Sequence, residues 1–203
     1  MALNFANNNS LSAITALPAS ISGGALTLLQ TQTASASATI DFTSNIDSTY
    51  DAYMFKFYDI HPATDGAYLT FNMSTDSGSN YNVTKTSSSF HAFHNESDTV
   101  TSLSYDTVGD LAQSTGNQYI SNNVGNDNDQ NVSGTLTIFN PSSSVFVKHF
   151  ISNTNVSQNT DYSINTYVGG YGNTTNPIDA IQFLMTSGNI DYGTIKLYGI
   201  KDS

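Results

Sequence analysis

The residues best placed to do chemistry are oxygen-bearing side chains at alternate positions of one polar run. Asp127, Asp129 and Asn131 stand in the segment GNDNDQNV. Calcium takes carboxylate and amide oxygens from flexible loops, so this alternation predicts a calcium site. Val132 occupies the place where a helix–loop–helix calcium motif requires glycine. A solvated polar loop without metal explains the same residues, and both interpretations stay open.

The histidines and the single glutamate do not predict a catalytic centre. The four histidines are His61, His91, His94 and His149, and the glutamate is Glu96. A spacing of three places His91 and His94 on opposite faces of a strand, whereas zinc needs three or four converging ligands. We find no Ser–His–Asp pattern and no GxSxG motif, and a glycosidase pair would have to be built largely from aspartates. We therefore expect a protein that is not an enzyme.

The charge balance excludes several classes of partner. The 203-residue chain has five lysines, no arginine and a formal net charge of -11. Nucleic acids and anionic membranes both select basic surfaces, so neither is an expected partner. No apolar run approaches the roughly 20 residues that span a bilayer. Only 10% of residues are charged, so the surface must be mainly neutral and polar, as is typical of extracellular and virion-surface β proteins.

Strands must position these side chains, and the clearest strand signal lies in residues 53–73. Tyr53, Phe55 and Phe57 place a ring at every second position, which puts all three on one face of a strand. After a turn at 61–66, alternation returns over 67–73. We predict that these two strands are antiparallel neighbours whose apolar faces line one core.

The remaining chain reads as short strands separated by polar turns. We predict strands at 26–29, 38–43, 134–138, 145–151 and 162–168, a hairpin from 81–85 and 88–94, a short helical turn at 108–113, and a final hairpin from 181–185 and 195–199. This pattern predicts an all-β fold, an antiparallel β-sandwich of jelly-roll type, formed by residues 25–203.

Residues 1–24 are predicted to form an extended N-terminal arm. Leu11, Ile14 and Leu17 have helical spacing, but Pro18 ends that turn. These scattered apolar residues are too few to build a core, so we expect the arm to anchor the protein on a partner subunit. A frayed terminus is the alternative.

Several segments carry a family resemblance. They are IDFTSNIDSTYDAYMFKFYDIHPATDGAYLTFNMSTDSGSNY (40–81), LTLLQTQTASASATIDFT (26–43), DLAQSTGNQYISNNVGNDNDQNVSG (110–134), FNPSSSVFVKHFI (139–151) and SGNIDYGTIKLYGI (187–200). The chain resembles a widespread family of structural proteins of tailed phages, abundant in marine and cyanobacterial phages. The resemblance implies a non-enzymatic virion protein, either a capsid decoration or a fibre or tail surface component. It implies contacts with other virion proteins and self-association, a trimer being favoured, and it supplies no catalytic residues.

A second function remains open, that of a carbohydrate-binding phage adhesin. Tyrosines 105, 119, 167 and 171 lie in or near polar segments, and amphipathic rings can stack on sugars or line a protein interface. In this interpretation the partner is a host glycan, and calcium near Asp127 and Asp129 would assist. A sugar-cleaving depolymerase is a third interpretation, and it requires two carboxylates paired in a cleft.

Overall fold

The computed structural model describes residues 25–201, and within this range the chain forms strands, turns and loops but no helix. The all-β prediction is therefore confirmed. The strands are β1 (Leu26–Thr33), β2 (Ile40–Phe42), β3 (Ala52–Pro62), β4 (Leu69–Ser74), β5 (Lys85–Asn95), β6 (Thr101–Tyr105), β7 (Leu111–Ser114), β8 (Gln118–Tyr119), β9 (Val132–Phe139), β10 (Lys148–Gln158), β11 (Tyr162–Gly172), β12 (Ala180–Met185) and β13 (Ile190–Ile200). No helix that could cross a membrane occurs in this part of the chain. The predicted arm, residues 1–24, lies outside the described residues.

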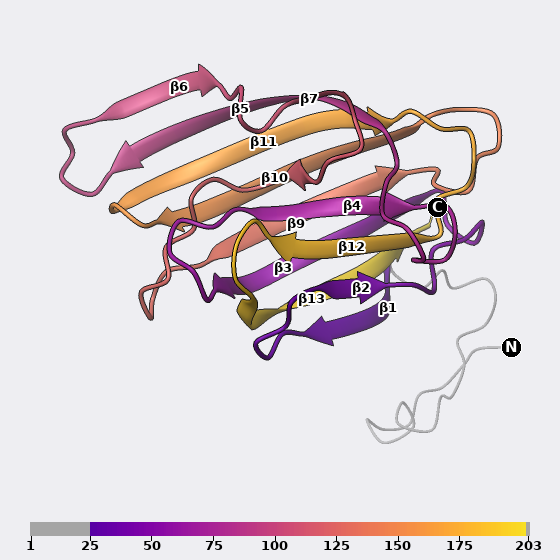
Figure 1. Cartoon of the computed structure of the whole chain (residues 1–203), viewed down its shortest axis with the longest axis horizontal. Helices are drawn as coiled ribbons and strands as arrows, with labels where there is room; N and C mark the ends of the chain where they lie inside the picture. The colour runs from indigo at the N-terminus through magenta and orange to yellow at the C-terminus, as the bar shows by residue number, and fades with distance from the viewer. Residues whose placement is uncertain (1–24, 202–203) are drawn as a thin grey trace, which may run out of the picture.

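The strands form two antiparallel sheets that pack face to face. The large sheet has the order β1-β13-β3-β9-β10-β11-β5-β6, with β7 beside β5, and the small sheet has the order β2-β12-β4-β8. In Figure 1 the small sheet lies in front of one part of the large sheet, while β11, β5 and β6 extend beyond it. The architecture is thus sandwich-like at one end and a longer single sheet at the other.

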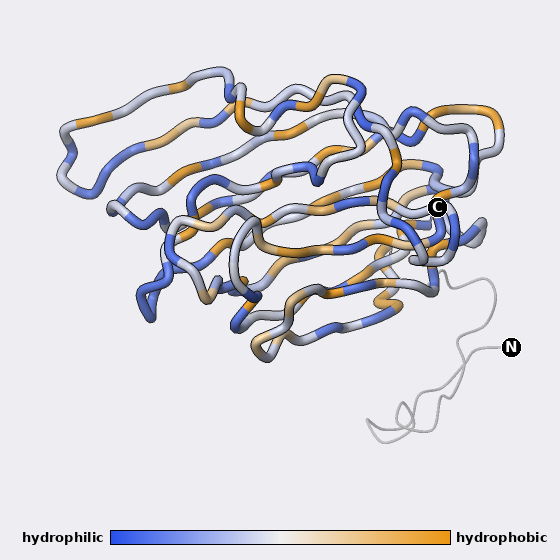
Figure 2. Tube along the Cα trace, in the orientation of Figure 1, coloured by the Kyte–Doolittle hydropathy of each residue, from blue (hydrophilic) through white to orange (hydrophobic). Residues whose placement is uncertain are grey.

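Aromatic rings from both sheets fill the space between them. Tyr53, Phe55 and Phe57 of β3 are 1%, 0% and 2% exposed, which confirms that these rings face the core. Phe183 of the small sheet lies among them, with its ring centroid 5.1 Å from that of Phe55 and 5.3 Å from that of Phe57, both edge-on. Phe42 contacts Phe55 in the same way at 5.2 Å. Edge-to-face pairs of this kind contribute beyond the area they bury. Apolar and polar residues alternate along these strands in Figure 2.

Two predicted strand pairings are wrong. The strand β3 pairs with β13 and β9, whereas β4 pairs with β12 and β8 in the other sheet. The final segments also separate, because β12 belongs to the small sheet and β13 to the large one. In both cases the apolar faces meet across the core instead of side by side. Alternation determines which face of a strand is buried, but it does not determine which strand lies beside it.

Two local predictions are also wrong. Residues 81–84 are outside any strand, and β5 runs without interruption from Lys85 to Asn95, so the predicted hairpin is absent. The predicted helical turn at 108–113 is instead a turn at 107–109 that leads into β7. Long-range pairing explains the first difference, because β5 pairs with β11 along its whole length. Tertiary contacts of this kind outweigh local propensity.

Two of the five lysines are fully buried. The Lys85 Nζ donates to Asn72 Oδ1 at 2.6 Å and to the Val83 carbonyl at 2.8 Å. The Lys148 Nζ donates to the Phe146 carbonyl at 2.7 Å. Within residues 25–201 the only ion pairs involve histidine, so both ammonium groups rely on neutral oxygens. Burial lowers the pKa of Lys85 to about 8 and lowers that of Lys148 as well, because it disfavours the charged form.

Candidate functional site

A β-bulge interrupts β3 directly after its aromatic half. Asp59 has a φ of 52°, and the pairing of β3 with β9 shifts register between Phe57 and Ile60. As a result Tyr58 and Asp59 are both exposed, although regular alternation would turn one of them inward, and Ile60 returns to the core. The Asp59 N–H donates to the Ser133 hydroxyl at 3.0 Å. Bulges of this type re-aim side chains and are frequent beside functional sites.

A second irregularity lies opposite, on β13. Gly193 has a φ of 116°, and a Cβ added there would lie 2.6 Å from the Asp59 carbonyl oxygen. Only glycine fits this close approach with this backbone conformation. Ile190 and Ile195 are both in the core although five positions separate them, so one residue between them is extra. The irregularity leaves Tyr192 65% exposed.

The loop at 126–131 supplies a third wall. The Gln130 side chain organises this loop from a buried position, since its Oε1 accepts the Asp127 N–H at 3.2 Å and its Nε2 donates to the Gln158 carbonyl at 3.4 Å. In Figure 1 this loop precedes β9, and its residues are uniformly hydrophilic in Figure 2. A buried amide therefore helps to hold a fully polar loop in place.

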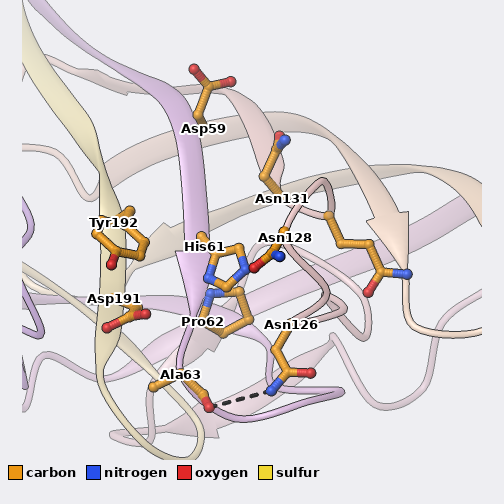
Figure 3. Close-up of a pocket in the computed structure, with 10 residues that line it drawn as sticks. Asp59, His61, Pro62, Ala63, Asn126, Asn128, Asn131, Asp191 and Tyr192 are labelled. Atoms are coloured by element: carbon orange, nitrogen blue, oxygen red, sulfur yellow. Dashed lines mark hydrogen bonds between the residues drawn. The ribbon is translucent and has the colours of Figure 1, made fainter.

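These three segments enclose a polar cleft of about 450 Å³. Figure 3 shows Asp191 and Tyr192 on one side, the loop asparagines on the other and His61 between them. The Asn126 Nδ2 donates to the Ala63 carbonyl at 3.4 Å, which closes one end of the cleft. The lining residues are Asp59, His61, Pro62, Ala63, Asn126, Asn128, Gln130, Asn131, Asp191 and Tyr192.

His61 connects the strand wall to the loop. Its Nε2 lies 3.2 Å from the Asp127 carbonyl oxygen, and since a carbonyl only accepts, Nε2 carries the proton and donates. The ring also packs edge-on against Tyr192, with centroids 6.1 Å apart. Its Nδ1 is buried and has no hydrogen-bond partner among the described residues. The histidine therefore keeps one acceptor position unused beside the cleft.

The cleft combines carboxylates and amides with one aromatic surface. The two carboxylates accept hydrogen bonds, and the asparagine amides both donate and accept. The tyrosine ring offers an apolar face with a polar edge. A concave surface of this composition suits a small ligand rich in hydroxyl groups, because each hydroxyl also donates and accepts.

Of the three residues predicted to bind calcium, one lines the cleft. Asn131 lines the cleft, whereas Asp127 and Asp129 are exposed on the adjoining turn and do not line it. The Asp127 carbonyl already accepts from the Gln130 N–H at 2.9 Å and from His61. Across residues 25–201 no three histidine or acidic side chains converge in a way that could hold a metal ion. The calcium site stays a prediction.

The tyrosines predicted to contact sugars lie away from the cleft. Three of them pack on neighbouring rings, with centroids 4.9 Å apart for Tyr167 and Phe90, 5.1 Å for Tyr119 and Tyr68, and 6.0 Å for Tyr171 and His149. None of the four, Tyr105, Tyr119, Tyr167 and Tyr171, lines the cleft. The tyrosine that does so is Tyr192, which the sequence interpretation missed. The signal that could have found it is the break in alternation just before Gly193.

The structure also brings together a serine, a histidine and an aspartate that the sequence did not connect. The Ser104 Oγ lies 3.0 Å from His91 Nε2, and Asp106 Oδ2 lies 3.7 Å from His91 Nδ1. The second distance is too long for a hydrogen bond. Asn122 Nδ2 is closer to Nδ1, at 3.3 Å, and it is held as the donor because Asn122 Oδ1 accepts the Asn123 N–H. The imidazole proton then resides on Nε2 and is donated to the serine, which is the reverse of nucleophile activation.

Comparisons with family models, with curated proteins and with solved structures find no match to this chain. The strand order and the cleft are therefore the features of the chain that bear on its function.

Proposed function

We propose that the fold is a jelly roll enlarged by two insertions. The support is the order of eight strands, which are β1, β2, β3, β4, β8, β9, β12 and β13. Counted from one to eight along the chain, they stand in the order 1-8-3-6 in the large sheet and 2-7-4-5 in the small one. Each sheet thus alternates early and late strands, as two interlocked Greek keys require. The insertions β5–β7 and β10–β11 pair with each other and lengthen the large sheet.

On this fold we propose a non-enzymatic structural protein of a tailed-phage virion, either a capsid decoration or a fibre or tail surface component. The strand order is the observation that carries the proposal, because jelly rolls recur in viral capsid proteins. The family resemblance and the arginine-free, acidic surface agree with it. Since one fold hosts many functions, the assignment needs a direct test on particles.

Self-association, with a trimer favoured, is part of the proposal. The large sheet ends in β1 and β6, and each of these strands pairs on one side only within residues 25–201. Both edges carry exposed apolar side chains, including Leu28 on β1 and Leu103 on β6, the latter 72% exposed. Uncovered sheet edges are templates for pairing with another chain. We expect further contacts with other virion proteins through residues 1–24.

Purified particles provide the decisive test. Antibody labelling in electron microscopy, together with quantitative mass spectrometry, should find the protein at a fixed copy number per virion. Deleting residues 1–24 should reduce its incorporation, and light scattering should give three times the chain mass in solution. Recovery of the full-length protein only in the soluble lysate, with none on particles, would refute the virion role.

The cleft favours one further candidate, a carbohydrate-binding adhesin whose partner is a host glycan. Its polar lining and exposed tyrosine are the supporting features, and jelly rolls also occur among lectin domains. Calcium at Asp127, Asp129 and Asn131 belongs to this candidate. Glycan binding that a chelator abolishes would support the calcium site, whereas an empty glycan array beside full particle occupancy would leave decoration as the sole role.

A further inference from the structure

We propose that the cleft between the β3 and β13 bulges and the 126–131 loop binds a neutral sugar, with Tyr192 as the stacking platform. The inference rests on the adhesin candidate above and names both its site and its ligand class. Four features of the cleft support it: its rigid walls, its exposed ring, its hydrogen-bonding groups and its negative charge.

The walls of the cleft are fixed before any ligand arrives. The two bulges meet where the Gly193 backbone approaches the Asp59 carbonyl, a contact too close for any side chain at position 193. The Asp59 N–H is held by Ser133, and the loop is held by Gln130 and by the hydrogen bond from His61. A pre-formed site loses little conformational entropy on binding, so weakly interacting ligands such as sugars can be captured.

Tyr192 presents a ring where a sugar would need one. It is 65% exposed, and His61 supports its ring from one side at a centroid distance of 6.1 Å. An exposed aromatic ring beside a polar cleft offers an apolar face to a bound ligand. The C–H face of a pyranose covers such a ring while its hydroxyl groups point to the polar walls.

The surrounding groups match the hydroxyl pattern of a sugar. Asp59 and Asp191 provide charged acceptors, which form the stronger class of hydrogen bond. Asn128 and Asn131 provide amides that can donate or accept on the facing wall. The volume of about 450 Å³ lies in the range of small-molecule sites, so the cleft fits a short saccharide.

Charge selects neutral sugars over acidic ones. Two carboxylates line the cleft, and among the described residues that form its walls none is a lysine. The whole chain carries a formal charge of -11, which adds a repulsive field for any anion. Like charges brought together in an interface disfavour the wrong partner. Sialic and uronic acids should therefore be excluded.

The test uses the full-length protein and defined sugars. A glycan array is followed by titration calorimetry with glucose, galactose, mannose, N-acetylglucosamine, N-acetylneuraminic acid and glucuronic acid. At least one neutral sugar should bind, and neither acid should. Tyr192→Ala should weaken that binding by about two- to tenfold, the equivalent of one lost stacking contact. Tyr105→Ala is the matched control, since it removes another exposed tyrosine from β6 and should leave binding unchanged.

Three results would overturn the inference: no binding of any neutral sugar, preferential binding of an acidic one, or equal binding by the wild type and Tyr192→Ala. Circular dichroism and thermal melting of both variants separate lost binding from lost folding. Particle occupancy measured in parallel separates this inference from the virion role. A protein present on particles that binds no sugar refutes only the cleft assignment, and one that binds sugar but is absent from particles refutes only the virion role.

Discussion

The two halves of β3 differ in role: the first contributes to the core and the second lines the cleft. In the first half, Tyr53, Phe55 and Phe57 alternate without interruption and build the core. In the second half, the positive φ at Asp59 breaks the alternation and turns polar side chains toward the cleft, where His61 also lies. The contrast teaches that periodicity builds the core of this protein, whereas an interruption of periodicity builds its candidate site.

The neighbouring strand β13 is divided in the same way, with a regular segment beside the regular half of β3 and an irregular segment beside the irregular half. Ile195 and Leu197 of β13 pair with Phe57 and Phe55 and share their burial. The irregular segment 190–194 of β13 lies beside the irregular half of β3. The large sheet therefore has a core end, where the strand pairing is regular, and a cleft end, where it is interrupted by bulges. Substitutions at the two ends should have different effects.

The largest difference should come from shortening one side chain at each end. Phe55→Ala removes ring contacts to Phe42 and Phe183 from a fully buried site, so we expect a loss of about 3–5 kcal/mol in the free energy of unfolding. Tyr192→Ala acts at an exposed site and should change it by no more than about 0.5 kcal/mol. Urea denaturation of both variants measures the two values. Similar losses would remove the distinction between the two ends.

The next largest effect should be a pH dependence of stability that comes from the buried lysine Lys85 in the interior. The pKa of Lys85 falls from 10.5 to about 8 on folding, so its burial penalty is complete below pH 8 and fades between pH 8 and 10.5. Stability should therefore rise with pH, by about 2 kcal/mol between pH 8 and 9.5. Stability is measured only up to pH 9.5 because tyrosines with raised pKa values, such as Tyr81 at about 12, lower the stability at higher pH.

Lys85→Met is the control for this pH dependence. It removes the titrating group, so most of the slope should disappear, and a smaller residual slope from Lys148 should remain. Absolute stability is a poor readout in this variant, because Asn72 Oδ1 and the Val83 carbonyl lose their donor. An unchanged slope, measured by urea denaturation at pH 8 and 9.5, would show that Lys85 is not the source.

Substitution of the glycine at the bulge should destabilise the protein more than substitution of a glycine in a regular strand. Gly193→Ala places a Cβ against backbone atoms at a φ of 116°, and we expect it to cost about 1–3 kcal/mol. Gly169→Ala in β11 is the matched control, since a Cβ there meets nothing within 4 Å, and it should be neutral or slightly stabilising. Thermal melting ranks the two variants. Equal tolerance would mean that the bulge pair is loosely held.

The same division explains what the sequence could predict. The inward rings of β3 were predictable because period-two alternation reports directly on burial. Strand partners were not, because β3 and β4 bury their apolar faces in the same core whether they lie side by side or in opposite sheets. The cleft was hardest to predict, since it joins Asp59, Asn128 and Tyr192 from distant segments. The positive φ at Asp59 was also hidden, because nothing in the sequence distinguishes this aspartate from the others. Bulges depend on the register of neighbouring strands, which a single sequence does not contain.

Asp59→Gly should change stability as little as Tyr192→Ala does, and it would sharpen the comparison most. Glycine adopts the φ of 52° without strain, while it also increases the entropy of the unfolded chain. These effects oppose each other, so the free energy of unfolding should change by no more than about 0.5 kcal/mol. Asp59→Val is the counterpart, because a β-branched residue is strained at positive φ and should cost about 1–3 kcal/mol.

Sugar binding distinguishes the two roles of Asp59. If its backbone shapes the bulge and its carboxylate contacts the ligand, Asp59→Gly should weaken neutral-sugar binding while leaving the melting temperature nearly unchanged. At the core end the two effects cannot be separated, because the same Phe55 ring determines how the side chains pack and contributes the stabilising contacts. Calorimetry and melting curves on the same preparation give both values. Full binding by Asp59→Gly would show that the carboxylate takes no part in the site and that the bulge serves only to expose Tyr192.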